Sequence, residues 1–466
     1  EDFNHILNLI KKLKYDYLSG YKKIYNIEKK LNVVHTKDKF KRNEGSLMPR
    51  GIKLWARAKK IIPGGNMMLS KRPNQFLPNK WPTYFSKSKG CQIWDIENKK
   101  YYDFSLMGVG TNILGYANLA VDREIQKIIN KGNLTTLNCP EEVTLADKLI
   151  KMHPWSQMVK FTRSGGEANA VAIRIARTYS KKKKIMVCGY HGWHDWYLAS
   201  YFNNKKNFHN HLPNEIKISG IPKNLSDDIF IFKYNDFSEI EKIYNKNKKD
   251  IGILKMEVSR NEKPKKNFLK KVRNFCNKNK IILIFDECTS GFRESFGGLH
   301  LKYKVNPDIA IFGKALGNGY AINAVIGKRR IMNAAEQTFI SSTFWTERIG
   351  PTAALATLKE MKKIKSWNII SSKGIYIKKM WQSIFSKNNF EVKIHGLDSM
   401  PVFLFPKNNE LYKTYIAQEM LKRGFLTSNS IYLSISHTDK LIEKYLENFS
   451  KVITNLKKID QQDLEN

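Results

Sequence analysis

The fold is decided by two stretches of sequence, Ile281-Ile282-Leu283-Ile284-Phe285-Asp286-Glu287 and Ile309-Ala310-Ile311-Phe312-Gly313-Lys314. Each is an unbroken apolar run of strand length that ends in charged residues. Three more runs of this kind precede them, at residues 184–188, 229–232 and 251–256, with helical patterns between the runs. Continuous apolar strands separated by helices are typical of a parallel sheet with helices on both faces. The sequence therefore predicts an α/β domain whose ligands bind beyond the carboxyl ends of its strands.

Other patterns flank this alternation, which spans residues of about 120 to 330. Residues 84–104 contain three short strand patterns separated by turn signals, which indicate an antiparallel meander. Beyond residue 335 the chain returns to helices and a few strands, and it ends in an amphipathic helix near residues 441–456. We expect a basic helical extension at 1–48, the N-terminal part of a small α+β domain at 49–105, a large domain at 106–334, and the C-terminal part of the small domain at 335–466.

The bulk composition narrows the class of protein. The 81 basic and 42 acidic residues give a net charge of +39, but the lysines are spread along the whole chain, which disfavours a dedicated nucleic-acid surface. The five cysteines form no C-x-x-C pair and predict neither a disulfide framework nor a zinc site. No apolar run is long enough to span a membrane, and no secretory signal is visible at the start. We therefore expect a cytoplasmic protein with no membrane partner and no specific nucleic-acid partner.

Two polar motifs in the alternating region could meet a flat, anionic ligand. Ser164-Gly165-Gly166 precedes a helical pattern, where free N–H groups can bind an anion. A simple helix cap is the alternative interpretation. Tyr190-His191 follows the run at 184–188, where an aromatic side chain can stack on a flat ring or pack in the core. No carboxylate completes a zinc set with His191 and His194, so we expect no metal.

The two stretches that decide the fold also end in reactive side chains. Asp286 ends an apolar strand, which suits a buried carboxylate facing a cation, although a helix cap is also open. Lys314 follows the next strand, where desolvation would make its amine a nucleophile, although a lysine whose head reaches solvent is the alternative. Together the four motifs supply an anion site, a stacking ring, a carboxylate and an amine. These are the requirements of pyridoxal 5'-phosphate (PLP).

At this point the sequence resembles the class III aminotransferases, and most closely their glutamate-1-semialdehyde 2,1-aminomutase branch. The resemblance covers residues from about 50 to the C-terminus and implies the type I fold of PLP-dependent transferases, with a large, mostly parallel three-layer domain and a smaller α+β domain. The matching segments are Pro63-Gly64-Gly65-Asn66, Ser164-Gly165-Gly166-Glu167-Ala168, Tyr190-His191-Gly192, Asp286-Glu287-Cys288-Thr289-Ser290-Gly291-Phe292-Arg293, Asn306-Pro307-Asp308, Gly313-Lys314 and Ser342-Thr343-Phe344.

The resemblance also implies roles for individual residues. Lys314 would hold PLP as a Schiff base and then move the substrate proton, and Asp286 would pair with the pyridinium nitrogen. Tyr190 would stack on the ring, with His191 and Cys288 also in the cofactor site. Ser164, Gly165 and Gly166 would hold the phosphate. Thr343 would reach the phosphate of a neighbouring subunit, which implies a homodimer with shared active sites.

Several positions depart from the family pattern. Gly166 stands where a hydroxyl residue is usual, and Arg163 can then supply charge to the phosphate. Cys288 replaces a common Val and is expected to pack as a small apolar residue. The substrate-binding Arg of the aminomutases aligns with Ser70, with Arg72 two positions later. A Glu-Pro-x-x-Gly-Asn segment is replaced here by Glu257-Val258-Ser259-Arg260-Asn261, and residues 344–348 also differ.

These features predict a PLP-dependent aminotransferase that moves an amino group between a small amino donor and a carbonyl acceptor. We expect Arg72, Glu257 and Arg260 to be substrate residues, since a guanidinium suits a carboxylate or phosphate. The nearest alternative is a glutamate-1-semialdehyde aminomutase, in which the amine shifts within one molecule. A more distant alternative is a basic nucleic-acid-binding protein that has the same fold but no catalysis.

Overall fold

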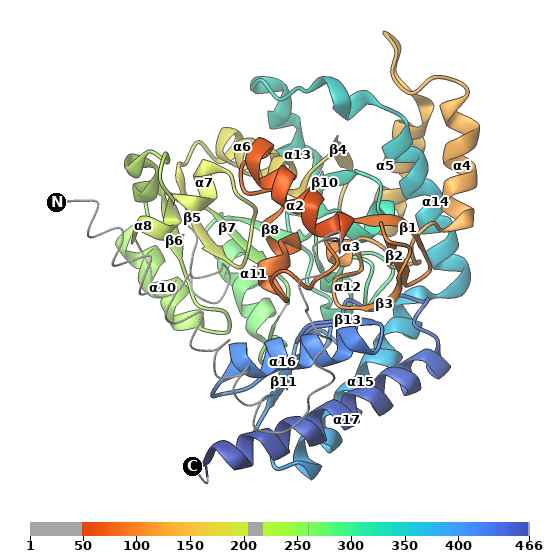
Figure 1. Cartoon of the computed structure of the whole chain (residues 1–466). Helices are drawn as coiled ribbons and strands as arrows, with labels where there is room; N and C mark the ends of the chain where they lie inside the picture. The colour runs from red at the N-terminus through yellow and green to blue at the C-terminus, as the bar shows by residue number, and fades with distance from the viewer. Residues whose placement is uncertain (1–48, 204–217, 260, 465–466) are drawn as a thin grey trace, which may run out of the picture.

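The computed structural model describes residues 49–203, 218–259 and 261–464 (Figure 1). The expected basic extension at 1–48 and the predicted substrate residue Arg260 lie outside these ranges.

A seven-stranded sheet, in the order β4-β10-β9-β8-β7-β5-β6, forms the centre of the larger half of the molecule. Strands β9, β8, β7, β5 and β6 are parallel to one another, and β10 is antiparallel to both of its neighbours. All five apolar runs expected from the sequence are strands of this sheet. The seven strands of the sheet are β4 (Met158–Thr162), β5 (Lys184–Cys188), β6 (Ile229–Ile231), β7 (Ile251–Glu257), β8 (Ile282–Glu287), β9 (Ile309–Phe312) and β10 (Asn323–Gly327).

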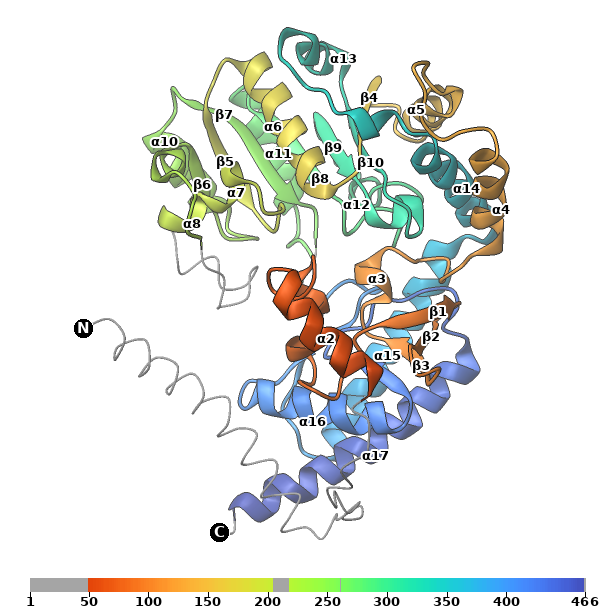
Figure 2. The ribbon, with the colours of Figure 1, turned by 45° about the horizontal axis from the view of Figure 1, so that its top comes forward.

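Helices cover both faces of this sheet, as expected for strands that are apolar on both sides (Figure 2). Helix α6 (Gly165–Ser180) and the short α13 (Arg329–Met332) pack on one face. Helices α10 (Phe237–Lys246) and α11 (Phe268–Lys278) pack on the other. Near β4 and β10, the second face is completed by α4 (Leu119–Ile129), α5 (Pro140–Met152) and α14 (Ile349–Ile364).

Successive residues of a strand point to opposite faces of a sheet, and this rule sets the geometry of the site. In β8, Ile284 packs in the cluster beneath α6, whereas Phe285 packs in the cluster beneath α11. The next two residues continue the alternation. Asp286 therefore lies on the α6 face and Glu287 on the opposite face, although the two are adjacent in sequence.

A second, four-stranded sheet joins distant parts of the chain. Strands β1 (Phe85–Lys89), β2 (Gln92–Asp95) and β3 (Lys100–Phe104) form the expected antiparallel meander, and β13 (Phe425–Thr427) pairs with β3 in parallel. Figure 2 shows the orange meander beside the blue C-terminal helices.

The domain boundaries after residues 105 and 334 remain predictions. The other elements are α2 (Arg50–Ile61), α3 (Met107–Gly110), α7 (Asp195–Leu198), α8 (Ser200–Asn203), α12 (Leu299–Tyr303), α15 (Ser366–Lys387), β11 (Lys393–His395), β12 (Val402–Leu404), α16 (Asn409–Lys422) and α17 (Asp439–Leu464).

Across the described ranges, no helix combines the length and the apolar character needed to cross a membrane.

Candidate active site

Strand register brings the predicted motifs to one edge of the large sheet. Glu257 of β7 pairs with Asp286 of β8, and Asp286 pairs with Ile311 of β9. Lys314 follows β9 by two residues, and Tyr190-His191 follows β5 at the same edge. The carboxyl ends of parallel strands meet at one edge, so this convergence is a direct result of the topology.

Asp286 is buried, with 3% of its surface exposed, and it lies among cationic and donor groups. Its Oδ2 atom is 2.8 Å from His191 Nδ1 and 3.7 Å from Lys255 Nζ, and its Oδ1 accepts a hydrogen bond of 3.1 Å from the Cys288 amide. Burial alone would raise the pKa of Asp286, but Lys255 and His191 hold this pKa well below its usual value. The carboxylate is therefore ionised at neutral pH.

Lys314 begins the 3-10 turn η4 (Lys314–Gly317) in a strained backbone conformation, with φ of 44°. A non-glycine residue in this region costs about 1–3 kcal/mol, and such strain is concentrated at functional sites. The Lys314 Nζ donates a hydrogen bond of 3.0 Å to Thr289 Oγ1. Thr289 follows β8, so the lysine amine is held against the same strand end that carries Asp286.

The start of α6 supplies the expected anion site. Ser164 caps the helix: its Oγ accepts from the Glu167 amide at 3.4 Å, while Glu167 Oε2 accepts from the Ser164 amide at 2.9 Å. This capping box does not use the amides of Gly165 and Gly166, which lie at the positive end of the helix. A Cβ added at Gly165 would lie 3.5 Å from Cys288 Sγ, so the helix start adjoins the Asp286 strand end.

The space that a side chain at position 166 would need is filled by His194, which comes from another loop. A Cβ added at Gly166 would lie 2.8 Å from both Cδ2 and Nε2 of the His194 ring. Any side chain at position 166 would therefore collide with the His194 imidazole. The glycine that departs from the family pattern thus creates the space in which this imidazole packs.

The guanidinium of Arg163 binds a distant segment of the chain. Its guanidinium binds Glu347 Oε1 at 2.7 Å through Nε, and the carbonyl oxygens of Trp345 and Glu347 at 2.9 and 2.7 Å through Nη2. These contacts fix the 343–348 segment to the turn before α6. The Glu347 carboxylate therefore offsets the charge that Arg163 was expected to supply to the phosphate.

Tyr190, Glu257 and Cys288 complete the inner part of the site. The Tyr190 amide donates to Glu257 Oε2 at 3.0 Å, so Glu257 supports the turn that carries the Tyr190 ring. That ring is 36% exposed and meets Tyr197 edge-on. Burial, followed by the charge of Asp286, raises the pKa of the Cys288 thiol well above its usual value. Cys288 is therefore a neutral packing residue, as the sequence suggested.

The structure also describes two further predicted residues, Thr343 and Arg72. Thr343 begins the exposed turn η6 (Thr343–Thr346). The guanidinium of Arg72 packs under the Gly64 turn, where an added Cβ would lie 2.0 Å from Arg72 Nη2. Within the described ranges, no group of three His, Cys, Asp or Glu side chains could hold a metal ion.

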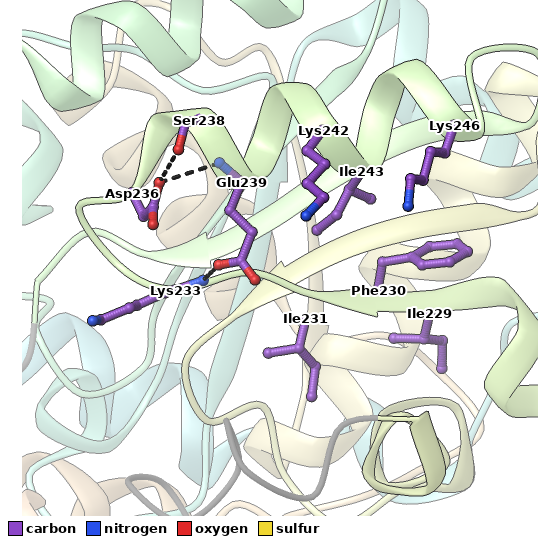
Figure 3. Close-up of a pocket in the computed structure, with 10 residues that line it drawn as sticks. All are labelled: Ile229, Phe230, Ile231, Lys233, Asp236, Ser238, Glu239, Lys242, Ile243 and Lys246. Atoms are coloured by element: carbon purple, nitrogen blue, oxygen red, sulfur yellow. Dashed lines mark hydrogen bonds between the residues drawn. The ribbon is translucent and has the colours of Figure 1, made fainter.

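A separate hollow of about 530 Å³ lies at the far edge of the large sheet, between β6 and α10 (Figure 3). Asp236 there accepts hydrogen bonds from the Ser238 hydroxyl and the Glu239 amide, and Glu239 accepts from the Lys233 amide. Strands β5 and β7 separate this edge from β8. The hollow is therefore not part of the cluster around Asp286 and Lys314.

The cluster fits PLP on its own geometry. An ionised, buried carboxylate suits the ring nitrogen, a lysine amine held at a strand end suits the aldehyde, and the unused amides at the start of α6 suit the phosphate. Three contacts were not foreseen from the sequence: Thr289 to Lys314, Lys255 to Asp286, and His194 to Gly166. Only the order of the strands and the path of the loops bring these residues together.

Comparisons with known proteins agree with this geometry. The family model "Aminotransferase class-III" matches residues 78–453. A 3-aminobutyryl-CoA aminotransferase of Cloacimonas acidaminovorans is 33% identical over 88% of this chain and 98% of its own length. A glutamate-1-semialdehyde 2,1-aminomutase of Wigglesworthia glossinidia brevipalpis is 34% identical over 87% of this chain and 98% of its own length.

Solved structures share the fold. The FumI protein of Sphingopyxis sp. MTA144, solved with PLP, has a TM-score of 0.79 at 22% identity and covers 87% of this chain and 96% of its own. A beta-phenylalanine aminotransferase from Variovorax paradoxus has a TM-score of 0.76 at 18% identity and covers 94% of this chain and 98% of its own. The chain therefore has the type I fold and belongs to the class III aminotransferase family, whose members are PLP-dependent aminotransferases and related aminomutases.

Proposed function

We propose that this chain is an aminotransferase that moves an amino group from a small amino donor to a carbonyl acceptor, with Lys314 as its Schiff-base lysine. The observation that carries the proposal is the position of Lys314 Nζ, held by Thr289 at the same strand end as the ionised Asp286. An amine and a carboxylate at one end of a cofactor-sized site are the two groups that PLP chemistry requires.

Bound PLP supplies an electron sink for the bond that breaks at the donor carbon. With PLP bound, the Lys314 amine would act as the general base, and it would move the proton from the donor carbon to the cofactor carbon. Asp286 keeps a proton on the ring nitrogen, because its negative charge stabilises the pyridinium. Tyr190 covers one face of the ring and excludes water from it.

Gly165 and Gly166 would hold the phosphate with their amides at the positive end of α6, and Ser164 would add its hydroxyl, because its own amide donates to Glu167. His194 supplies the hydrogen bond that a hydroxyl side chain at position 166 would give, since its Nε2 packs into that space. The phosphate thereby keeps the same number of hydrogen-bond donors, and the chain keeps its affinity for PLP. In this proposal, Gly166 and His194 together replace the hydroxyl side chain that is usual at position 166.

The active enzyme is a homodimer in this proposal. Thr343 is exposed beside the large apolar side chains of Phe339 and Phe344, which are 83% and 71% exposed. The Arg348 amide bonds the Asn133 carbonyl, which joins this segment to the loop before α5. Exposed apolar surface of this kind suits a second copy of the chain, with Thr343 of each copy reaching the phosphate in the other. Light scattering measures the dimer, and Thr343→Ala should weaken PLP binding without unfolding the chain.

A reducing compartment such as the cytoplasm suits this enzyme. All five cysteines are unpaired, and four of them are buried. Free cysteines of this kind are usual where glutathione keeps thiols reduced.

Arg72, Glu257 and Arg260 are the substrate residues in the proposal. The Nε of Arg72 is buried, and it has no hydrogen-bond partner among the described residues, which suits an arginine awaiting an anionic group. Substitution of each by Ala should raise the donor KM. A variant whose donor KM is unchanged removes that residue from the substrate site.

The decisive experiment is a visible spectrum of the purified protein, followed by titration with a panel of amino donors. A donor that bleaches the cofactor band and releases its keto acid supports transfer. Isomerisation of glutamate-1-semialdehyde without any external donor supports the aminomutase alternative, which the matched aminomutase relatives favour. A preparation that stays colourless with added PLP, and binds RNA or DNA tightly at low salt, would support the nucleic-acid alternative instead.

A further inference from the structure

Lys255 is a fully buried lysine with no assigned role. It lies in β7, every residue of which is buried, and it shares the α6 face with Ile253. Its Nζ lies 3.7 Å from Asp286 Oδ2, too far for a hydrogen bond. In the described part of the chain this Nζ has no hydrogen-bond partner at all.

Stability does not explain this lysine. An ammonium loses several kcal/mol of solvation on burial, and a charge pair without hydrogen bonds does not recover that loss. Its strand neighbours across the sheet are Val187 and Ile284, so an apolar side chain of similar size would fit this position with less cost. A buried and incompletely satisfied charge beside a reactive carboxylate points to a role in the site.

The contacts of Asp286 suggest what that role is. Oδ1 accepts from the Cys288 amide, and Oδ2 meets both His191 and Lys255. The ring nitrogen of PLP would be one more partner of the same carboxylate. Each cation near the carboxylate reduces the negative potential that the ring nitrogen experiences.

We propose that Lys255 is a positioning residue that shares the Asp286 carboxylate with the ring nitrogen of PLP and weakens the hold of that carboxylate on the nitrogen's proton. The inference rests on the proposed function, because it needs PLP bound with its ring nitrogen at Asp286. The ring then withdraws electrons less strongly than it would beside an unshared aspartate.

The other charged and titratable groups around Lys255 are consistent with this role. Burial lowers the pKa of Lys255, while Asp286, Cys288 and Glu257 act to raise it. Burial and Lys255 together lower the pKa of His191. Lys255 Nζ and the His191 ring are the two groups that face Asp286 Oδ2, and only Lys255 does so without a hydrogen bond.

The test is the protonation of the ring nitrogen itself. Wild-type protein and Lys255→Met are reconstituted with PLP labelled with 15N in the ring, and the 15N resonance is followed against pH. The ring nitrogen should titrate in the wild type, and its pKa should rise by about one unit in Lys255→Met, because a neighbouring positive charge is gone. Lys184→Met is the matched control: Lys184 starts β5 at the opposite end of the sheet, where it pairs with Asp250.

An unchanged ring-nitrogen pKa in Lys255→Met, with PLP bound, would overturn the inference and leave the proposed function intact. A wild-type protein that binds no PLP would instead overturn the proposed function. If Lys255→Met does not fold, Lys255→Gln serves as the second neutral variant. The wild type alone also decides the matter: a ring nitrogen that stays protonated at every pH at which the protein is folded contradicts the inference.

Discussion

Asp286 and Glu287 are adjacent acids at the end of β8, and the sheet separates them into two different environments. Glu287 is saturated: its carboxylate accepts from the His300 ring at 2.6 Å, the amides of Leu299 and His300 at 2.6 and 2.9 Å, and the Ser290 hydroxyl at 2.8 Å. Asp286, on the other face, accepts two hydrogen bonds and lies beside an ammonium that it does not bond.

The contrast separates a structural carboxylate from a functional one. Glu287 has every lone pair matched by a fixed donor, and it joins β8 to α12 through His300. Asp286 retains capacity for a further partner, which the proposed function assigns to PLP. Both carboxylates are buried, so the completeness of the hydrogen bonding, and not burial, distinguishes the two roles.

Substitution of Lys314 is the change with the largest expected effect. It should lower the activity that depends on the Asp286 face of the sheet, and it should leave the stability of the chain unaffected. Lys314→Ala should lower kcat by roughly 10⁴-fold or more, since it removes both the Schiff-base amine and the general base. The free energy of unfolding of the apoprotein should change little, because Ala keeps the Cβ and therefore has the same backbone strain at φ of 44° as the lysine. Steady-state kinetics and urea unfolding measure the two quantities. Activity close to wild type would contradict the assignment.

Asp286→Asn should come next, with a loss of about 10²–10³-fold in kcat, because a neutral amide no longer stabilises a positive ring nitrogen. The variant should still bind PLP through Lys314 and show an altered visible band. Kinetics and spectra check these outcomes. A fully active Asn variant would mean that Asp286 is as structural as Glu287.

The sequence predicted the features of this face that depend on a single segment. Continuous apolar runs located β5, β7, β8 and β9 to within about two residues, and the polar residues that end them located Asp286 and Lys314. β10 was missed because its five residues begin with Asn323 and resemble a loop. Its antiparallel pairing closes the sheet against β4.

The contacts between segments could not be predicted in the same way. Lys255 interrupts an apolar run and reads as an exposed lysine until the pairing of Glu257 with Asp286 fixes its neighbour. Arg163 was expected to supply charge to the phosphate because Gly166 lacks a hydroxyl group, but the chain brings Glu347 to Arg163 from 184 residues away. Such pairs depend on loop paths, which local pattern does not encode.

Glu287→Gln sharpens the contrast from the opposite face. It should reduce the free energy of unfolding by about 2–4 kcal/mol, because a buried and fully bonded carboxylate loses acceptors and its partner His300. The kcat of the folded fraction should remain within a few-fold of wild type. Urea unfolding and active-site-normalised kinetics measure the two effects. A large loss of kcat at full stability would place Glu287 in the chemistry.

His194→Ala should have the smallest effect of the set. Loss of one hydrogen bond to a charged phosphate should weaken PLP binding about tenfold, which corresponds to about 1.4 kcal/mol. Titration of the apoprotein with PLP measures this change, with His395→Ala in β11 as a control on a distant histidine. An unchanged affinity would remove His194 from the phosphate site.

The most direct test of the account is to find which lysine carries the cofactor. The holoprotein is reduced with borohydride, digested, and searched by mass spectrometry for the pyridoxyl group. The account predicts the label on the peptide that contains Lys314 and none on the peptide that contains Lys255. A label on Lys255 or on any other lysine, or no label at all, would contradict it.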